Sequence, residues 1–296
     1  MTNCREIVVL SGKGGTGKTS VAASLAFVAG NDAVLADCDV DAANLHLVME
    51  PDYYSSEEFF GGDLAVIKVV NCISCGLCKD ICRFDAVKHT NGKFEIDILK
   101  CEGCGYCYHV CPAKAISLVP RKSGDVFLSN IKNRSKMAHA RLSVGGENSG
   151  KLVIKVKNEA KILASELDCN YIIVDGAPGI GCPVIASVSG ASVALLVTEP
   201  TMSALHDLKR VMFVINRFRV KPLLIINKFD INPLISQEIK DYASVQGIIH
   251  VADIPYNPFF TQSIGRGQIV AEEHPEIATL FRSIWDIVKV NSIKSY

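Results

Sequence analysis

Short apolar runs alternate with longer mixed stretches along most of this chain. The run Ile7–Leu10 precedes a glycine-rich segment, the apolar stretch Thr19–Ala29 has the length of a helix, and the run Ala33–Ala36 ends in Asp37. Short apolar runs bounded by turn residues are typical of buried strands. The pattern therefore predicts a strand, a helix and a second strand, in that order.

The same rhythm returns in the second half of the chain. The stretch Lys151–Leu167 has the spacing of an amphipathic helix. Apolar strands separated by helical stretches are expected at Tyr171–Val174, Ala191–Thr198, Leu223–Asn227 and Ile248–Val251. Apolar strands that alternate with helices favour a mostly parallel sheet covered by helices on both faces. The predicted fold class is therefore α/β.

The middle of the chain has a different character. Residues 68–118 contain clustered cysteines, short strands such as Phe94–Asp97, and an internal repeat in which Cys82–Val87 matches Cys111–Ile116 at an offset of 29 positions. Residues 119–150 have a weak pattern and a basic stretch at 121–141, which we interpret as a solvated loop or docking patch. We expect one α/β domain formed by 1–67 and 119–296, with a small α+β domain inserted at 68–118.

Charge and hydropathy exclude several classes of partner. Lys and Arg balance Asp and Glu at 31 each, so net charge predicts neither a nucleic acid nor an anionic membrane as partner. No stretch approaches the ~18 apolar residues of a membrane helix, and no secretory segment precedes the first strand. Cysteines spaced for metal on an unexported chain point to a reducing compartment, so a cytoplasmic location is expected.

The glycine-rich segment fits the pattern G-x-x-x-x-G-K-[ST] between a strand and a helix. Such a loop turns backbone N–H groups toward phosphate oxygens, while its lysine reaches the β- and γ-phosphates and its last hydroxyl ligates Mg²⁺. The strand–helix context disfavours a glycine turn without chemistry. The expected nucleotide-binding residues are Gly12, Lys13, Gly14, Gly15, Thr16, Gly17, Lys18 and Thr19.

The second lysine of this loop, Lys13, gives it a resemblance to the deviant Walker A ATPases of the MinD/ParA and nitrogenase iron protein superfamily. The resemblance implies a homodimer with ATP and Mg²⁺ between the subunits, in which Lys13 reaches the phosphates of the partner subunit. It also implies that Asp39 orients the attacking water and that Asp37 and Asp175 lie near the metal. The catalytic residues expected on this basis are Lys13, Lys18 and Asp39.

Later loops extend the resemblance over the chain. Asn227, Pro255 and Tyr256 follow apolar strands and resemble the family's adenine pocket, although an isolated Asp or Asn in such loops is often a helix N-cap. The segment Gly145–Lys151 imitates a second phosphate loop. It ends in Leu152 without a hydroxyl for Mg²⁺ and follows no apolar strand, so a loop that leads into a helix is the better interpretation.

Eight of the twelve cysteines form two copies of C-x2-C-x2-C-x3-C, a spacing typical of proteins that hold two [4Fe–4S] clusters. Because the fourth cysteine of each run ligates the other cluster, two crossed ligand sets are expected. Zinc is the alternative, which the tandem runs and the repeat disfavour. The expected sets are Cys72, Cys75, Cys78 and Cys111 for one cluster and Cys101, Cys104, Cys107 and Cys82 for the other.

Two residues near these motifs leave alternatives open. Arg83 replaces the proline that follows Cys111 in the second run, and its guanidinium points either to the cluster of Cys101 or to solvent. Cys182 lies seven residues after Asp175, where the nitrogenase iron protein resembles this chain in carrying a cysteine for a bridging cluster. A buried small thiol is the default interpretation of Cys182.

The motifs together resemble MinD-like P-loop ATPases that carry an inserted bacterial-type ferredoxin domain. This resemblance implies a homodimeric ATPase that passes electrons to a redox partner protein in step with nucleotide state. The alternatives are a carrier of Fe–S clusters, and a MinD-like positioning protein with a C-terminal membrane helix. The apolar positions around Trp285 have helical spacing and favour a core helix instead: Leu280, Phe281, Ile284, Ile287 and Val288.

Overall fold

The computed structural model describes residues 4–132, 135–143, 145 and 149–293. The chain divides into two compact units. The larger unit comprises Met1–Glu57, Val126–Arg141 and Ser149–Tyr296, and the smaller one Glu58–Asp125 and Leu142–Asn148. The predicted insertion at 68–118 falls within the smaller unit, and its assignment as a ferredoxin domain stays a prediction.

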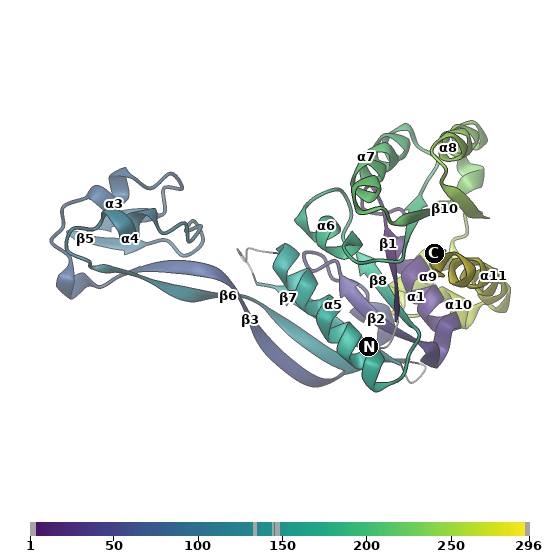
Figure 1. Ribbon diagram of the computed structural model, residues 1–296, viewed down its shortest axis with the longest axis horizontal. Helices are drawn as coiled ribbons and strands as arrows, with labels where there is room; N and C mark the ends of the chain where they lie inside the picture. Colours follow the sequence, from purple (N-terminus) through teal and green to yellow (C-terminus); the bar gives the residue numbers. More distant parts are fainter. Residues whose placement is uncertain (1–3, 133–134, 144, 146–148, 294–296) are drawn as a thin grey trace. The chain divides into compact units, whose positions relative to one another are not determined.

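The larger unit is built on a sheet with the strand order β11-β10-β9-β1-β8-β2-β7-β6-β3 (Figure 1). Of β3 and β6, only Asp52–Glu57 and Val126–Asn130 belong to this unit. Strand pairing is parallel from β11 to β7. The strands are β1 (Arg5–Leu10), β2 (Ala33–Cys38), β3 (Asp52–Ile67), β6 (Ile116–Asn130), β7 (Lys136–Leu142), β8 (Tyr171–Gly176), β9 (Val193–Thr198), β10 (Lys221–Asn227) and β11 (Ile249–Ile254). The predicted parallel α/β fold is thus confirmed for this unit.

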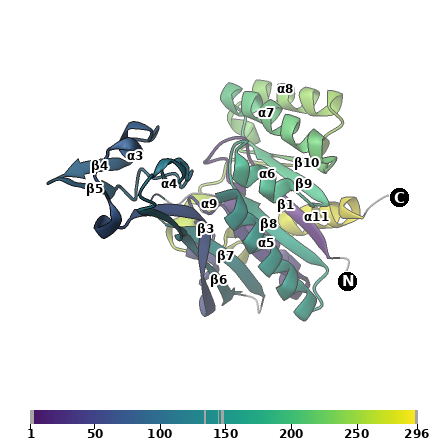
Figure 2. The ribbon, with the colours of Figure 1, turned by 60° about the vertical axis from the view of Figure 1, so that its left-hand side comes forward.

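Helices cover both faces of this sheet (Figures 1 and 2). One face carries α1 (Lys18–Ala29), α10 (Val270–Glu273) and α11 (Pro275–Ser292). The other carries α5 (Ser149–Glu166), α6 (Cys182–Val188), α7 (Met202–Phe218) and α8 (Pro233–Val245). The short helices α2 (His46–Met49) and α9 (Phe259–Gly265) lie in loops that follow strands.

The core of the larger unit explains why its strands are apolar throughout. Strand residues such as Ile7, Leu35 and Ile173 are fully buried, because helices pack on both sides of them. In α11 the side chains of Phe281 and Trp285 are also buried. The prediction of a core helix at the end of the chain is confirmed, and within the described ranges every helix is too short or too polar to traverse a lipid bilayer.

Strand register brings two acidic residues together. Asp37 of β2 lies directly beside Asp175 of β8, and Val9 of β1 is the other neighbour of Asp175. All three strands end at this edge of the sheet, where β1 continues into the glycine-rich loop. The carboxyl ends of parallel strands are the usual place for ligand sites in such folds, so the fold positions these carboxylates next to the loop.

The expectation of a solvated loop at 121–141 is wrong for its described part, and the alternative of a docking patch stays a prediction. Most of that stretch lies in β6 and β7, and Arg121 is 8% exposed. Lys122 pairs with Glu58 and Asp125. Most of the basic residues therefore lie in strands, and Lys122 is held there by ion pairs. Arg134 lies outside the described residues.

The smaller unit contains α3 (Leu77–Asp80), β4 (Val87–Thr90), β5 (Lys93–Ile96) and α4 (Tyr106–Val110). Strands β4 and β5 form an antiparallel pair. The side chain of Phe94 packs with buried Cys78, Cys101 and Ile116 in a small core. This core is separate from the one in the larger unit and is lined largely by cysteines.

The internal repeat extends to the backbone of the smaller unit. Gly76 and Gly105, 29 positions apart, both have positive φ and both precede a short helix. Asp85 and Lys114, at the same offset, both adopt the left-handed conformation. Two copies of one backbone course therefore carry the two cysteine runs.

Candidate nucleotide site and cysteine-lined unit

The glycine-rich loop joins β1 to α1 and packs tightly against its neighbours. A Cβ at Gly12 would lie 2.5 Å from the Cβ of Asp207 in α7, so only glycine fits there. Gly17 has φ 95° and caps α1, and a Cβ there would lie 2.4 Å from the side-chain amide of Asn227. The loop is thus fixed by close approach to α7 on one side and to the end of β10 on the other.

Lys18 is the centre of the site's charge arrangement. Its Nζ lies 2.7 Å from Asp175 Oδ1 and 3.6 Å from Asp39 Oδ2, and its side chain is almost wholly buried. The hydroxyl of Thr19 donates a 2.8 Å hydrogen bond to the other oxygen of Asp175. Asp175 therefore orients both residues that are expected to meet the phosphates and Mg²⁺.

Burial and mutual repulsion control protonation in this cluster. Burial raises the pKa of Asp37 well above its ordinary range, and the charge of Asp175 raises it further. Burial also raises the pKa of Asp39. Burial lowers the pKa of Lys18, but the carboxylates of Asp175 and Asp39 outweigh this effect, so the pKa is raised overall. Lys18 stays charged while it holds these acids together.

The predicted metal ligands fit a divalent cation in their chemistry. Thr19 and Asp175 present oxygen atoms side by side, and Asp37 Oδ2 is buried without a hydrogen-bond partner in the described part of the chain. Mg²⁺ binds proteins through one or two carboxylates together with phosphates and water. Among the residues that the structure describes, no group of three or more His, Cys, Asp or Glu side chains is arranged to hold a metal ion by itself.

A cavity of about 560 Å³ opens beside the loop. This volume lies within the range of small-ligand sites. Lys18, Thr19 and Asp39 line it together with Asn227 and Lys228, and a further wall comes from α9 and the segment after it. Gly14, Gly15 and Gly17 also line it. The cavity therefore brings together most of the predicted nucleotide-binding residues.

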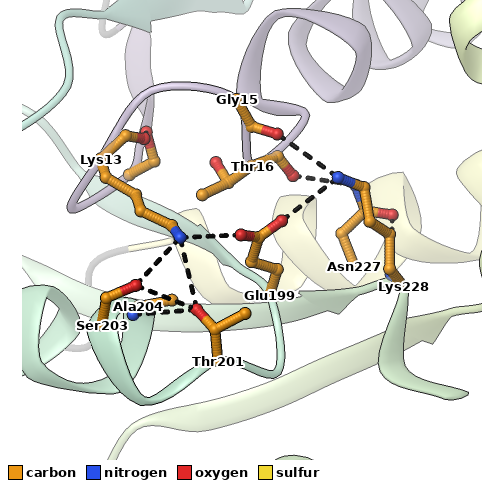
Figure 3. A network of polar contacts seen from close by, with 10 residues as sticks. Lys13, Gly15, Thr16, Glu199, Thr201, Ser203, Ala204, Asn227 and Lys228 are labelled. Atoms are coloured by element: carbon orange, nitrogen blue, oxygen red, sulfur yellow. Dashed lines mark hydrogen bonds and ion pairs between the residues drawn. The ribbon is translucent and has the colours of Figure 1, made fainter. Parts of the chain in front are cut away.

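Lys13 has partners that sequence reasoning missed (Figure 3). Its Nζ lies 2.8 Å from Glu199 Oε1 and donates hydrogen bonds to Thr201 Oγ1 at 3.3 Å and to Ser203 Oγ at 3.1 Å. Thr201 is also the N-cap of α7, accepting from the Ala204 N–H. The position of Glu199 directly after β9 was the available sequence signal, since Thr198 ends an apolar strand at the same edge of the sheet.

Glu199 pairs with two lysines of the site, Lys13 and Lys228. Its second oxygen lies 3.2 Å from Lys228 Nζ, which also donates to the Gly15 carbonyl at 3.5 Å (Figure 3). Burial raises the pKa of Glu199, but the hydrogen bonds and charges of Lys13 and Lys228 outweigh it and lower the pKa overall. Glu199 is therefore a carboxylate shared by Lys13 and Lys228 beside the phosphate loop.

The residues predicted for the adenine pocket divide into two groups. Asn227 lines the cavity, and its amide donates to the Thr16 carbonyl at 2.8 Å. Pro255 and Tyr256 do not belong to the described lining. The N–H of Tyr256 instead donates to Asp230 Oδ1 at 2.6 Å. The structure thus ties the loops after β10 and β11 together through Asp230, a residue that sequence analysis did not single out.

In the smaller unit a separate cavity is lined by one of the two predicted ligand sets: Cys72, Cys75, Cys78 and Cys111. Among the other four, Cys101 is buried, and Cys107 is close enough to Cys101 and Cys104 for their charges to interact. Cys82 Sγ accepts from the Ala86 N–H at 3.4 Å, and Cys111 Sγ accepts from the Ala115 N–H at 3.3 Å. The two fourth cysteines thus have equivalent surroundings.

The bare thiols are not preformed metal ligands. Burial raises the pKa of Cys107 to about 11 and also raises the pKa of Cys78. Metal binding to such cysteines releases protons, so a metal has to compete with protons at neutral pH. Arg83 and Cys182 are both exposed, which disfavours the buried-thiol interpretation of Cys182.

A strand, a glycine-rich loop and a helix, with Lys18 and Thr19 held by an aspartate from the adjacent strand, define a P-loop nucleotide-binding protein. Residues 7–270 match the CobQ/CobB/MinD/ParA nucleotide binding domain, and the chain belongs to this family. An uncharacterized protein of Methanocaldococcus jannaschii is 38% identical over 222 residues, which cover 74% of this chain and 76% of that protein.

Solved structures agree on the fold. The septum site-determining protein MinD of Pyrococcus horikoshii, complexed with Mg-ADP, superposes with a TM-score of 0.57 at 19% identity and covers 96% of both chains. An ATP complex of a McdA variant from Cyanothece superposes with a TM-score of 0.58 at 15% identity, over 100% of this chain and 99% of the other. The family and fold parts of the predicted resemblance are confirmed, and the iron–sulfur part stays a prediction.

Proposed function

We propose that this protein is a Mg²⁺-dependent nucleoside triphosphatase whose smaller unit holds two [4Fe–4S] clusters and exchanges electrons with a partner protein. ATP is the expected nucleotide, because the related MinD and McdA structures are complexes with ADP and ATP. The observation that carries the proposal is that one chain combines a complete P-loop arrangement with a cavity lined by Cys72, Cys75, Cys78 and Cys111.

At the phosphates the protein contributes positioning and charge. Backbone N–H groups of the loop hold the β- and γ-phosphates, and Lys18 neutralises charge that develops during transfer. Thr19 and Asp175 would hold Mg²⁺ through their oxygen atoms, and the carboxylate of Asp37 would support its charge. Asp39, half-buried and 3.6 Å from Lys18 at its Oδ2, accepts a hydrogen bond from the attacking water and orients it. Phosphate binding has to replace Asp175 as the partner of Lys18.

Lys13 would act across a homodimer. In the single chain Glu199, Thr201 and Ser203 hold its Nζ. Reaching the phosphates of a second subunit requires Lys13 to leave these partners, as an arginine finger enters a site from outside. A phosphate carries more charge than the Glu199 carboxylate, which supports such an exchange once nucleotide is bound.

The cysteines fit iron–sulfur chemistry better than zinc. Eight cysteines in two equivalent backbone copies supply two sets of four thiolates, with N–H donors to Cys82 and Cys111 of the kind that tune cluster potentials. When bound, each cluster supplies one-electron redox chemistry. The crossed ligand sets make the two backbone copies depend on each other.

A positioning ATPase is the second candidate. It is favoured by the similar structures, several of which are MinD or ParA family proteins. Such a role would use the nucleotide-dependent dimer without electron transfer. Metal content separates the two candidates, because a positioning ATPase has no need of eight cysteines in ligand spacing.

Anaerobic purification tests the proposal directly. We expect about eight iron and eight acid-labile sulfides per chain, together with Mg²⁺-dependent hydrolysis of ATP. Lys18→Ala is expected to lose nucleotide binding with its iron unchanged, and Lys13→Ala is expected to keep binding but slow hydrolysis by roughly 10³-fold. Stoichiometric zinc without labile sulfide would refute the cluster assignment and leave the nucleotide site standing.

A further inference from the structure

A buried arginine lies beside one of the cysteines of the smaller unit. Arg121 of β6 is 8% exposed, and its Nη1 donates a 2.8 Å hydrogen bond to the carbonyl of Cys101. Its Nη2 donates to the carbonyl of Gly145, in the second of the two stretches that form this unit. Two carbonyls from separate stretches of chain therefore hold the guanidinium next to Cys101.

The charge of this guanidinium is not offset by a carboxylate. An arginine side chain stays protonated in proteins, and both hydrogen-bond acceptors of Arg121 are uncharged carbonyls. In the described part of the chain no Asp or Glu forms an ion pair with it, whereas the neighbouring Lys122 pairs with Glu58 and Asp125. Burial of an unpaired charge is costly. The position of Arg121 therefore points to a negatively charged group beside Cys101 that is not a side-chain carboxylate.

The two predicted ligand sets differ in this respect. The Cys101 set comprises Cys101, Cys104, Cys107 and Cys82, and the Cys72 set comprises Cys72, Cys75, Cys78 and Cys111. At the repeat offset of 29, Cys101 corresponds to Cys72, and Arg121 corresponds to Gly92, which has no side chain. Among the residues that the structure describes, a cationic side chain donates to the carbonyl of Cys101 and none donates to that of Cys72.

Other features of the two sets match each other. Each set has one exposed cysteine at the same place in the repeat, Cys75 in one and Cys104 in the other. Each set also has one cysteine whose Sγ accepts a backbone N–H at nearly the same distance, 3.4 Å for Cys82 and 3.3 Å for Cys111. The buried charge of Arg121 is therefore the main difference between two otherwise equivalent sets.

A nearby positive charge favours reduction of an iron–sulfur cluster. The reduced cluster with its four thiolates carries one negative charge more than the oxidised cluster, so a cation stabilises the reduced form more strongly. Net charge, hydrogen bonds and solvent exposure set the potentials of such clusters. The effect of a charge is larger in a buried position, where the effective dielectric constant is low and salt does not screen it.

We propose that Arg121 raises the reduction potential of the cluster held by the Cys101 set above that of the cluster held by the Cys72 set. The first electron that the smaller unit accepts from its partner protein then resides in the Cys101 set. When that electron moves between the sets, one cluster is oxidised and the other is reduced, and no bond or proton changes. The inference rests on the proposed function, because it requires both clusters.

A second arginine provides a matched control. Arg83 follows Cys82, which belongs to the Cys101 set, and its side chain is exposed. Water and salt screen a charge in that position. Arg83→Gln and Arg121→Gln therefore remove the same charge beside the same set, and only the second substitution removes a buried one.

The test uses the full-length protein purified anaerobically. Iron and acid-labile sulfide are measured first, and a potentiometric titration followed by EPR then gives the two reduction potentials. In Arg121→Gln the amide still donates to the Cys101 carbonyl, but the charge is lost. We expect the equilibrium constant for reduction of the more easily reduced cluster to fall about 10-fold, which corresponds to 59 mV for a one-electron couple. The other potential should stay in place.

Two further variants separate the charge from the hydrogen bond and from local shape. Arg121→Lys keeps a positive donor and should retain most of the wild-type potential. Arg83→Gln should change the equilibrium constant by less than about threefold, because its charge is exposed. Equal shifts in Arg121→Lys and Arg121→Gln would overturn the inference, since they would show that the charge of Arg121 is not the cause.

Serine variants identify the cluster to which each potential belongs. Cys104→Ser and Cys75→Ser replace the exposed cysteine of each set with an oxygen ligand, which changes the potential of the cluster that it ligates. We expect Cys104→Ser to displace the more positive of the two potentials and Cys75→Ser to displace the more negative one. This measurement keeps Arg121 in place, so it decides the inference even if Arg121→Gln does not assemble its clusters.

The outcomes separate the inference from the proposed function. Protein that contains iron and labile sulfide, but whose potentials are the same in Arg121→Gln as in the wild type, would overturn the role of Arg121 and keep the clusters. Displacement of the more positive potential by Cys75→Ser would do the same. Wild-type protein without iron and labile sulfide would overturn both the inference and the cluster assignment.

Discussion

Asp37 is buried at the centre of the nucleotide site, and among the described residues no charged side chain donates a hydrogen bond to it. Its Oδ1 accepts the Asp39 N–H at 3.2 Å, while its buried Oδ2 accepts nothing in the described residues. Burial and the charge of Asp175 raise its pKa in the folded protein. The folded state therefore binds this proton more strongly than the unfolded chain does, and stability from it is lost as pH rises through the raised pKa.

Asp37→Asn should consequently raise the apparent Tm of the nucleotide-free protein at pH 7, where the ionised carboxylate is unfavourable. The gain should shrink toward pH 4, because wild-type Asp37 is then protonated in the folded state as well. With Mg²⁺ and nucleotide the order should reverse, since the variant lacks the charge that supports the cation. Melting curves at one scan rate measure this, with exposed Asp41→Asn as control. The same gain at both pH values would contradict it.

At the scale of elements, Lys157 of α5 holds the carboxyl end of α6. Its side chain is 3% exposed, and its Nζ donates to the carbonyls of Ser187 and Ser189 at 2.7 and 2.6 Å. The same Nζ lies 2.8 Å from Glu6 Oε2 on β1. The Lys157 ammonium therefore satisfies carbonyls at the end of α6 and links α5, α6 and β1.

Removal of that ammonium should be costly. Lys157→Met leaves Glu6 with a single partner and the carbonyls of α6 without a donor, so we expect a loss of about 3–5 kcal/mol in the free energy of unfolding. Urea denaturation gives the value. Lys161→Met removes the exposed partner of Glu6, which lies 2.8 Å away, and should cost less than about 1 kcal/mol. Similar losses of unfolding free energy in the two variants would show that the burial of Lys157 adds nothing to the stability of the protein.

Elements built from apolar runs were predictable from the sequence, and elements with polar buried faces were not. The run before Asp175 is apolar because helices cover both faces of β8, and the pattern identified it. Strand β6 instead buries Arg121, Ser123 and Ser129, and β3 is exposed along most of its length, so neither gave an apolar signal. Polar side chains satisfied by distant backbone, as when Ser123 donates to the Gly61 carbonyl, have no signature in a single sequence.

The residues of the nucleotide site also fall into those that the sequence predicted and those that it did not. Loop glycines, Lys18, Thr19 and Asp175 follow from local spacing, because the loop joins β1 to the start of α1 and Asp175 lies at the end of β8. The partners of Lys13 and the contact between Asp230 and Tyr256 join segments far apart in the chain. Such contacts depend on how the strands are ordered in the sheet, which spacing along the chain does not encode.

At the scale of the whole molecule, if the smaller unit holds the proposed clusters, nucleotide binding and cluster reduction should be linked. After Asp39 the chain forms α2 and then β3, which begins at Asp52 and enters the smaller unit at Glu58. If the two sites are coupled, linkage is reciprocal, and a typical coupling of ~1–3 kcal/mol corresponds to about 40–130 mV for a one-electron couple. We expect nucleotide to shift the reduction potential of at least one cluster by this amount.

Potentiometric titration followed by EPR measures the shift with no nucleotide, with diphosphate and with a non-hydrolysable triphosphate. Lys18→Ala is the control, because it should abolish the shift and leave the clusters in place. Potentials that agree within error under all three conditions would mean that the two units only share a chain.

The smaller unit is composed of two separate stretches, and this has a consequence for inheritance. Glu58–Asp125 is completed by Leu142–Asn148, which supplies a carbonyl of Gly145 to Arg121 and the N–H of Ser143 to Ser123. Between the two stretches runs β7, which pairs with β2 in the sheet of the larger unit. A gene fragment that encodes the whole smaller unit thus also carries a strand of the larger one. The smaller unit therefore cannot be transferred between genes as one continuous fragment without β7. We expect the two units to have evolved together.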